Sequence, residues 1–128
     1  MSRVFILGPT DYDISDALRF GDVVVIFMSS RPSIFDHNRF ASQFKTRVRS
    51  LGFNSRDDYF LCIGTAVPLL LSSSFLIQEY GSFKALFFHA SEQRYVMRVL
   101  GYEEGKSRVL PVRYEHIRTV ANPPREAP

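Results

Sequence analysis

The sequence predicts one α/β domain whose sheet is mostly parallel and ends in an antiparallel hairpin. Of its 128 residues, 45% are hydrophobic, which suits a chain that buries a single sizeable core. Three short apolar runs lack polar alternation, as is typical of central parallel strands: Val4–Leu7, Val23–Met28 and Tyr59–Ile63. Segments with helical periodicity separate these runs, whereas the last two predicted strands follow one another too closely for a helical crossover.

The first connection predicts a short helix. The first strand ends at Gly8–Pro9, and Gly21 closes the segment that follows. The start of this segment offers three capping side chains, Thr10, Asp11 and Asp13, and the expected apolar face consists of Ile14, Ala17 and Leu18. Two buried strands around a short helix indicate a parallel β-α-β unit.

The central part of the chain predicts two longer helices around the third strand. From about Asp36, apolar residues recur at helical spacing and end before Gly52; they are Phe40, Phe44, Val48 and Leu51. Thr65 is the expected N-cap of a helix over Ala66–Tyr80, which ends at Gly81. Because this second helix is apolar nearly all round, we expect the sheet to cover one side and a further layer or a partner to cover the other.

The C-terminal third predicts antiparallel strands. Phe83–His89 and Arg94–Leu100 are separated by a short turn, which requires antiparallel pairing. A sixth strand is expected at Arg108–Tyr114, where Pro111 would confine it to a sheet edge. The order of elements is that of a small Rossmann-like, three-layer domain over residues 1–120, followed by a flexible C-terminal tail over residues 121–128.

Charge and composition exclude several classes of protein. Sixteen Lys and Arg against 13 Asp and Glu give a net charge of +3, well short of a dedicated nucleic-acid binder. No apolar run reaches the ~18 residues of a membrane-spanning helix, and the N-terminal run is too short for a signal peptide. Cys62 is the single cysteine, so no internal disulfide can form and a reducing, cytoplasmic compartment is expected.

The carboxyl ends of the first and third strands are the expected ligand site. In open parallel sheets, ligands bind beyond these ends, where the strand order reverses. If the two strands are neighbours, their loops converge beside a helix N-terminus, which favours an anion. The candidate residues for a nucleotide or another phosphate-bearing ligand are Gly8, Thr10, Ser29, Arg31, Gly64 and Thr65. Neither loop holds a dinucleotide-binding or P-loop motif, so tight structural turns are the alternative explanation.

The remaining reactive residues predict no catalytic and no metal site. Asp11, Asp13 and Asp16 are better explained as helix caps than as ligands of a divalent cation. His89 is the only histidine near the expected ligand edge, and Cys62 lies within an apolar strand as inert core filling. The spacing assembles no nucleophile with a base and no acid–base pair of carboxylates, so the sequence favours a non-enzymatic protein and indicates no particular cofactor.

Cationic side chains form two groups that could contact the phosphates of a nucleic acid. One group lies in the first long helix and the other in the C-terminal strands; they include Arg39, Lys45, Arg47 and Arg49, and Arg94 and Arg98. Tyr95 and Tyr102 would supply stacking platforms between the latter. Acidic residues interleave with the second group, which favours solvated faces and charge-protected edge strands over a nucleic-acid surface.

A resemblance to a group of phage proteins covers residues 58–100. The Asp58–Tyr59 strand that ends in Gly64, the apolar helix to Gly81 and the Leu86 to Arg94–Tyr95 hairpin are similar to small Rossmann-like domains of phage and mobile-element genomes. The resemblance implies a phage or plasmid accessory protein that acts in the host cytoplasm, and it supplies no catalytic residues.

Three functions follow as hypotheses. The first is a binding module that acts through protein–protein interaction or self-assembly, which the apolar second helix and the open edge strand favour. The second is a regulatory domain that binds a phosphate-bearing ligand, and the third is a nucleic-acid-associated protein.

Overall fold

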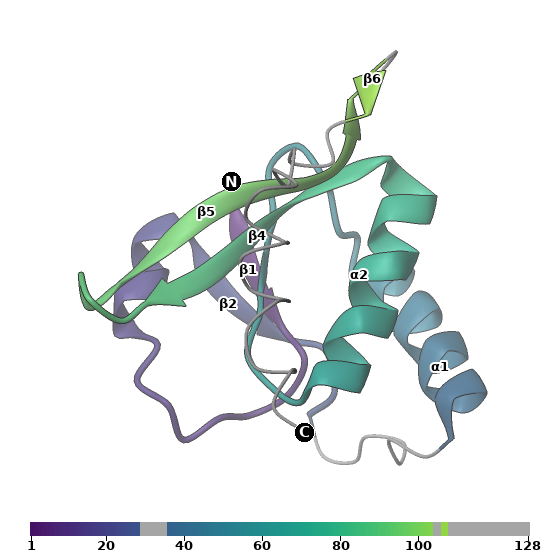
Figure 1. The fold of residues 1–128 in the computed structure, drawn as a ribbon. Coiled ribbons are helices and arrows are strands. Elements are labelled where there is room, and N and C mark those ends of the chain that lie inside the picture. The colour runs from purple at the N-terminus through teal and green to yellow at the C-terminus, as the bar shows by residue number, and fades with distance from the viewer. Residues whose placement is uncertain (29–35, 104–105, 108–128) are drawn as a thin grey trace, which may run out of the picture.

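The computed structural model describes residues 1–28, 36–103 and 106–107, and its strands form one sheet in the order β2-β1-β3-β4-β5-β6 (Figure 1). The strands are β1 (Arg3–Ile6), β2 (Asp22–Val25), β3 (Tyr59–Leu61), β4 (Ser82–His89), β5 (Arg94–Glu103) and β6 (Lys106–Ser107). The pairs β1–β2, β1–β3 and β3–β4 are parallel, whereas β4–β5 and β5–β6 are antiparallel. The predicted α/β architecture, with a mostly parallel sheet and an antiparallel extension, is therefore confirmed.

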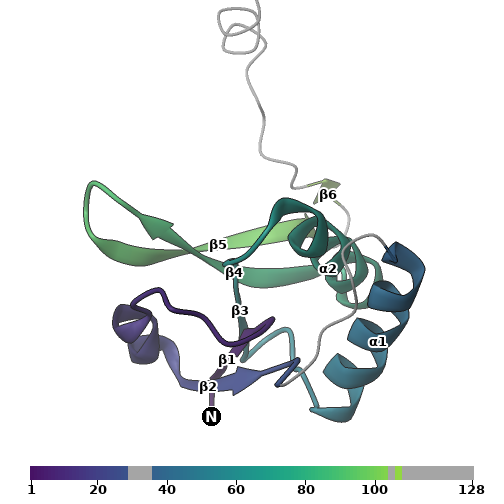
Figure 2. The ribbon, with the colours of Figure 1, turned by 90° about the horizontal axis from the view of Figure 1, so that it is seen from below.

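The two faces of the sheet carry different helices (Figure 2). Phe5 and Leu7 of the first strand segment pack with α1 (His37–Ser50) and α2 (Ala66–Tyr80), whereas Val4 and Ile6 pack with the 3₁₀ helix η1 (Ser15–Phe20). The connection from β1 leads to β2 on one side of it, whereas the connections from β2 to β3 and from β3 to β4 run across the sheet in the opposite direction. Under the right-handed crossover rule, such connections place their helices on opposite faces, as observed.

Helix α1 forms as the sequence predicts. The Asp36 side chain accepts a hydrogen bond from the backbone N–H of Arg39 at 3.1 Å and so caps the helix. Phe40, Phe44 and Val48 are buried, and the Phe44 ring meets rings of β3 and α2 edge-on. The apolar stripe therefore joins both helices to the sheet in one core.

Helix α2 is covered less completely than its composition suggests. Pro68, Ser72, Phe75 and Leu76 are buried, and the Ser72 hydroxyl donates to the Pro68 carbonyl at 2.7 Å, so this buried polar side chain is paired. Leu70, however, is 69% exposed. Thr65 precedes the helix in an extended conformation, but its side chain makes no capping hydrogen bond.

The predicted first helix differs from the observed η1. The sequence placed Leu18 on the apolar face, yet Leu18 is 53% exposed. A 3₁₀ helix has three residues per turn, so the buried face consists of Ile14, Ala17 and Phe20 instead. The expected caps also differ, because Ile14 is the residue before η1, and Asp13 accepts hydrogen bonds from the N–H and hydroxyl of Ser15.

β2 and β3 are shorter than predicted, β1 is shifted by one residue, and both strands of the hairpin are longer. β2 ends at Val25, although Ile26 and Phe27 still donate backbone hydrogen bonds to Ile6 and Leu7, and Met28 is exposed. β5 extends three residues beyond the predicted end at Leu100. The predicted sixth strand over 108–114 and the tail over 121–128 lie outside the described residues.

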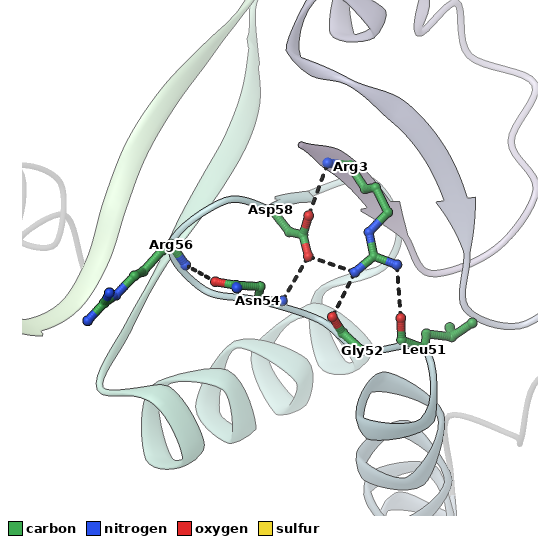
Figure 3. A network of polar contacts seen from close by, with 6 residues as sticks. All are labelled: Arg3, Leu51, Gly52, Asn54, Arg56 and Asp58. Atoms are coloured by element: carbon green, nitrogen blue, oxygen red, sulfur yellow. Dashed lines mark hydrogen bonds and ion pairs between the residues drawn. The ribbon is translucent and has the colours of Figure 1, made fainter. Parts of the chain in front are cut away.

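A buried carboxylate ties the amino-terminal edge of the sheet together (Figure 3). Asp58, only 1% exposed, accepts hydrogen bonds from the backbone N–H groups of Arg3 and Asn54 and pairs with the Arg3 guanidinium at 3.0 Å. The same guanidinium donates to the carbonyl oxygens of Leu51 and Gly52. The start of β1, the end of α1 and the turn before β3 are thereby held together at the edge opposite the candidate site.

Candidate functional site

Two adjoining cavities lie at the carboxyl ends of β1 and β3, which are neighbours in the sheet. The first, which we call the hairpin cavity, has a volume of about 370 Å³ and is lined by Tyr12, Asp13, Cys62, Ile63, Gly64, Phe88 and Tyr95. The second, the loop cavity, has a volume of about 440 Å³ and is lined by Gly8, Pro9, Thr10, Asp11, Tyr12, Ile63 and Gly64. Since three lining residues are shared, the two cavities form one candidate site.

The β4–β5 hairpin supplies one wall of this site because its end lies over η1 (Figure 2). The Asp16 carboxylate accepts a hydrogen bond from the Tyr95 N–H at 2.6 Å, and the Arg19 guanidinium donates to the Tyr95 carbonyl at 2.6 Å. Asp16 and Arg19 also pair with each other at 3.1 Å. The two side chains thus bond the outer edge of β5 as a neighbouring strand would, and they fix Tyr95 beside the cavity.

Aromatic side chains surround the hairpin cavity. Tyr95 is buried and opposes Phe88 in the β4–β5 register, with ring centroids 5.2 Å apart. Phe88 is 48% exposed and Tyr12 is 72% exposed, although both line the cavity. Large aromatic side chains left open to solvent at a concave site are typical of a surface that receives another molecule.

The charged groups of the site are carboxylates. Hydrogen bonds from the Ser15 hydroxyl and N–H lower the pKa of Asp13, and both bonds go to Oδ1. The hydrogen bond from the Tyr95 N–H lowers the pKa of Asp16, so both groups are ionised at neutral pH. Burial, followed by the charges of Asp13 and Asp16, raises the pKa of Tyr95. Among the described residues, neither cavity is lined by a lysine or an arginine.

The potential nucleophile and base of the site are not paired. Burial raises the pKa of the Cys62 thiol to about 12, so at neutral pH it is protonated and a poor nucleophile. His89 is exposed at the end of β4, where its Nδ1 lies 3.1 Å from the Ser91 hydroxyl, whereas the Cys62 sulfur lies 3.8 Å from the Phe60 carbonyl oxygen. The cysteine therefore acts as a cavity wall.

The residues predicted for a phosphate ligand are only partly brought together. Gly8, Thr10 and Gly64 line the loop cavity, whereas Thr65 is exposed and lines neither cavity. Ser29 and Arg31 lie outside the described residues. Sequence reasoning missed Tyr12, Ile63, Phe88 and Tyr95 as wall residues, because nothing local in the sequence indicates that the hairpin end lies over η1.

Most of the predicted nucleic-acid residues of α1 are engaged within the protein. Arg47 donates to the Ile26 carbonyl and lies over the Phe27 ring, and Arg49 pairs with Glu79 at 2.9 Å. Lys45 and Arg49 also lie over the Phe75 ring. Arg39, Arg94 and Arg98 are exposed. Arg39 lies on α1, whereas Arg94 and Arg98 lie on β5.

In the part of the chain that the structure describes, no group of three or more histidine, cysteine, aspartate or glutamate residues is arranged to hold a metal ion. No helix within the same residues is long and apolar enough to cross a membrane.

Comparison with known proteins identifies the family. No curated protein and no solved structure matches the chain significantly, so its relation to Rossmann-like folds stays a prediction. The family model described as "Phage Pam3 gp32-like protein" matches residues 5–101, a range that runs from β1 into β5 and includes the walls of both cavities. Because the match spans most of the sequence, the chain belongs to the phage Pam3 gp32-like family.

Proposed function

We propose that this phage-family protein is a non-enzymatic binding module whose hairpin cavity receives a side chain of a protein partner. The observation that supports this best is the composition of the cavity wall, where Tyr12 and Phe88 remain open to solvent beside the buried Tyr95. Aromatic side chains dominate protein interfaces because they bury a large area at a small cost in conformational entropy. A volume of about 370 Å³ accommodates one large side chain with room for adjacent contacts.

The chemistry of the site also supports binding over catalysis. The thiol of Cys62 is protonated at neutral pH, and the Asp13 carboxylate is ionised and held by Ser15. An acid–base mechanism needs a group whose pKa lies near the working pH, and these two groups are shifted away from it. Binding requires only the shape and polarity of the wall.

A second candidate is the phosphate-ligand domain that the sequence suggests. It is favoured by the loop cavity, which brings Gly8, Thr10 and Gly64 together at the neighbouring ends of β1 and β3. The carboxylate of Asp11, which lines the same cavity, counts against an anionic ligand. Thermal melting with ATP and with inorganic phosphate tests this candidate: a ligand-dependent rise in Tm that Thr10→Ala abolishes, or that Thr65→Ala or Arg31→Ala weakens, would favour it.

Site-specific photo-crosslinking tests the protein-binding proposal. Benzoylphenylalanine is placed at Tyr12, on the cavity rim, and in a control protein at Ser50, which is exposed at the C-terminal end of α1. In phage-infected cells we expect one discrete adduct from position 12, identified by mass spectrometry as a partner protein or a second copy. The adduct should disappear when Phe88→Ser removes the apolar wall. Equal adducts from both positions, or none from position 12, would refute the proposal.

A further inference from the structure

We infer that the hairpin cavity selects a cationic group, the guanidinium of arginine or the ammonium of lysine, on the protein that it binds. This inference rests on the proposed function and adds the chemistry of the recognised side chain. It combines two features of one cavity, its aromatic walls and the carboxylate at its rim.

Three aromatic side chains line the hairpin cavity. Tyr12, Phe88 and Tyr95 come from three different parts of the chain and all line the cavity. The negative face of an aromatic ring attracts a cation, most strongly where water is excluded. The long aliphatic stem of arginine or lysine would pack on the apolar parts of Ile63 and Cys62 on the way in.

The carboxylate of Asp13 lines the same cavity. Both of its hydrogen bonds from Ser15 go to Oδ1, so Oδ2 takes part in neither of them. A guanidinium or ammonium group that enters the cavity can donate to this oxygen in a charge-assisted hydrogen bond. A neutral side chain would lose this bond, and an acidic one would be repelled.

The other nearby charges leave the site net acidic. Arg19 is neutralised by its pair with Asp16, and both are committed to the backbone of Tyr95. Arg94 precedes Tyr95 on β5 and lies near Asp16, whose pKa its charge helps to lower, but it lines neither cavity. Asp11 lines the adjoining loop cavity and adds a second carboxylate. The site is thus an acidic spot on a chain whose net charge is +3.

A titration with matched ligands tests the inference on the full chain. N-acetyl-argininamide carries the guanidinium, and N-acetyl-citrullinamide replaces it by a neutral urea of nearly the same shape. Backbone amide chemical shifts report binding at each position, with Gly64, Phe88 and Tyr95 as the reporters of the cavity. We expect the arginine derivative to bind about tenfold more tightly than the citrulline derivative, as one cation–π contact and one ionic hydrogen bond would give.

Two variants remove the same charge from different places. Asp13→Asn keeps an acceptor for Ser15 but removes the carboxylate, so we expect weaker arginine binding and only the smaller preference over citrulline that the cation–π contact gives. Asp22→Asn removes an exposed carboxylate at the start of β2, at the opposite edge of the sheet, and should leave binding unchanged. Equal affinity for the two ligands, an equal effect of the two variants, or no shift at the cavity amides would overturn the inference.

The outcomes separate this inference from the proposed function. Photo-crosslinking at Tyr12 without selectivity for arginine would keep the protein-binding module and reject the cationic side chain. Selective arginine binding without any crosslinked protein would keep the cation site and reject the protein partner as its source. Failure of both measurements would reject the hairpin cavity as a binding site.

Discussion

Replacement of the buried Asp58 by alanine is expected to lower the free energy of unfolding by about 3–5 kcal/mol. The carboxylate accepts hydrogen bonds from the Arg3 N–H at 3.0 Å, the Asn54 N–H at 2.7 Å and the Arg3 guanidinium at 3.0 Å (Figure 3). Alanine would leave two backbone donors without an acceptor, at about 1–3 kcal/mol each. The ion pair adds less, because the Arg3 side chain is 34% exposed and still donates to two carbonyl oxygens.

Urea unfolding followed by circular dichroism measures this loss, and thermal melting should show Tm falling by roughly 10–20 °C. Arg3→Met keeps the carboxylate and both backbone hydrogen bonds, so we expect a smaller loss of about 1–2 kcal/mol. Asp57→Ala removes an exposed carboxylate from the same turn and should change stability by less than about 0.5 kcal/mol. A loss for Asp58→Ala no greater than that for Arg3→Met would refute the view that the backbone donors depend on this carboxylate.

Three further predictions concern the site and its supports. Gly101→Ala should cost at least about 3 kcal/mol in urea unfolding, because Gly101 has φ +123° and a Cβ there would collide with the backbone of Gly81 and Ser82 at the start of β4. Gly64→Ala, at φ +134° but with open space around the Cβ, should cost about 1–2 kcal/mol. The hydrogen bond from the Tyr95 N–H lowers the pKa of Asp16 in the folded protein. The stability that Asp16 contributes is therefore complete above the ordinary aspartate pKa and is lost as the pH falls below about 4. When Tm is measured against pH, Asp16→Asn should show a weaker decline in acid than the unsubstituted protein. Burial raises the pKa of the Cys62 thiol to about 12, so at pH 8 it should react with iodoacetamide about a thousandfold more slowly in the native protein than after unfolding. Equal rates in the two states would contradict its burial.

The elements of the fold could be predicted because their signals are local. Continuous apolar runs marked the parallel strands, and the spacing of Phe40, Phe44 and Val48 marked α1. The neighbouring placement of β1 and β3, on which the expected site depended, is also observed. The prediction failed at η1, because a segment of six residues does not distinguish a period of 3.0 from one of 3.6, and that difference decides whether Leu18 or Phe20 faces the sheet.

Asp58 shows how tertiary contacts escape a local pattern. In sequence it reads as the last residue of a polar turn, yet it is one of two buried polar residues among those described. Besides the Arg3 guanidinium, its partners are two backbone N–H groups, one of which lies 55 positions away. Backbone donors leave no mark in the sequence, so only the fold reveals why a carboxylate is needed there.

The site itself depends on a contact between two elements that are not neighbours in the sheet. η1 follows β1, whereas Tyr95 belongs to β5, three strands away in the sheet order. Asp16 and Arg19 bring them together by bonding the backbone of Tyr95, and the aromatic wall of the hairpin cavity results from that contact. The sequence located the carboxyl ends of β1 and β3 from a general property of parallel sheets. It did not indicate the aromatic wall of Phe88 and Tyr95, because that wall comes from a hairpin folded over a short 3₁₀ helix, and it is this wall beside Asp13 that led us to propose a cationic side chain in place of phosphate.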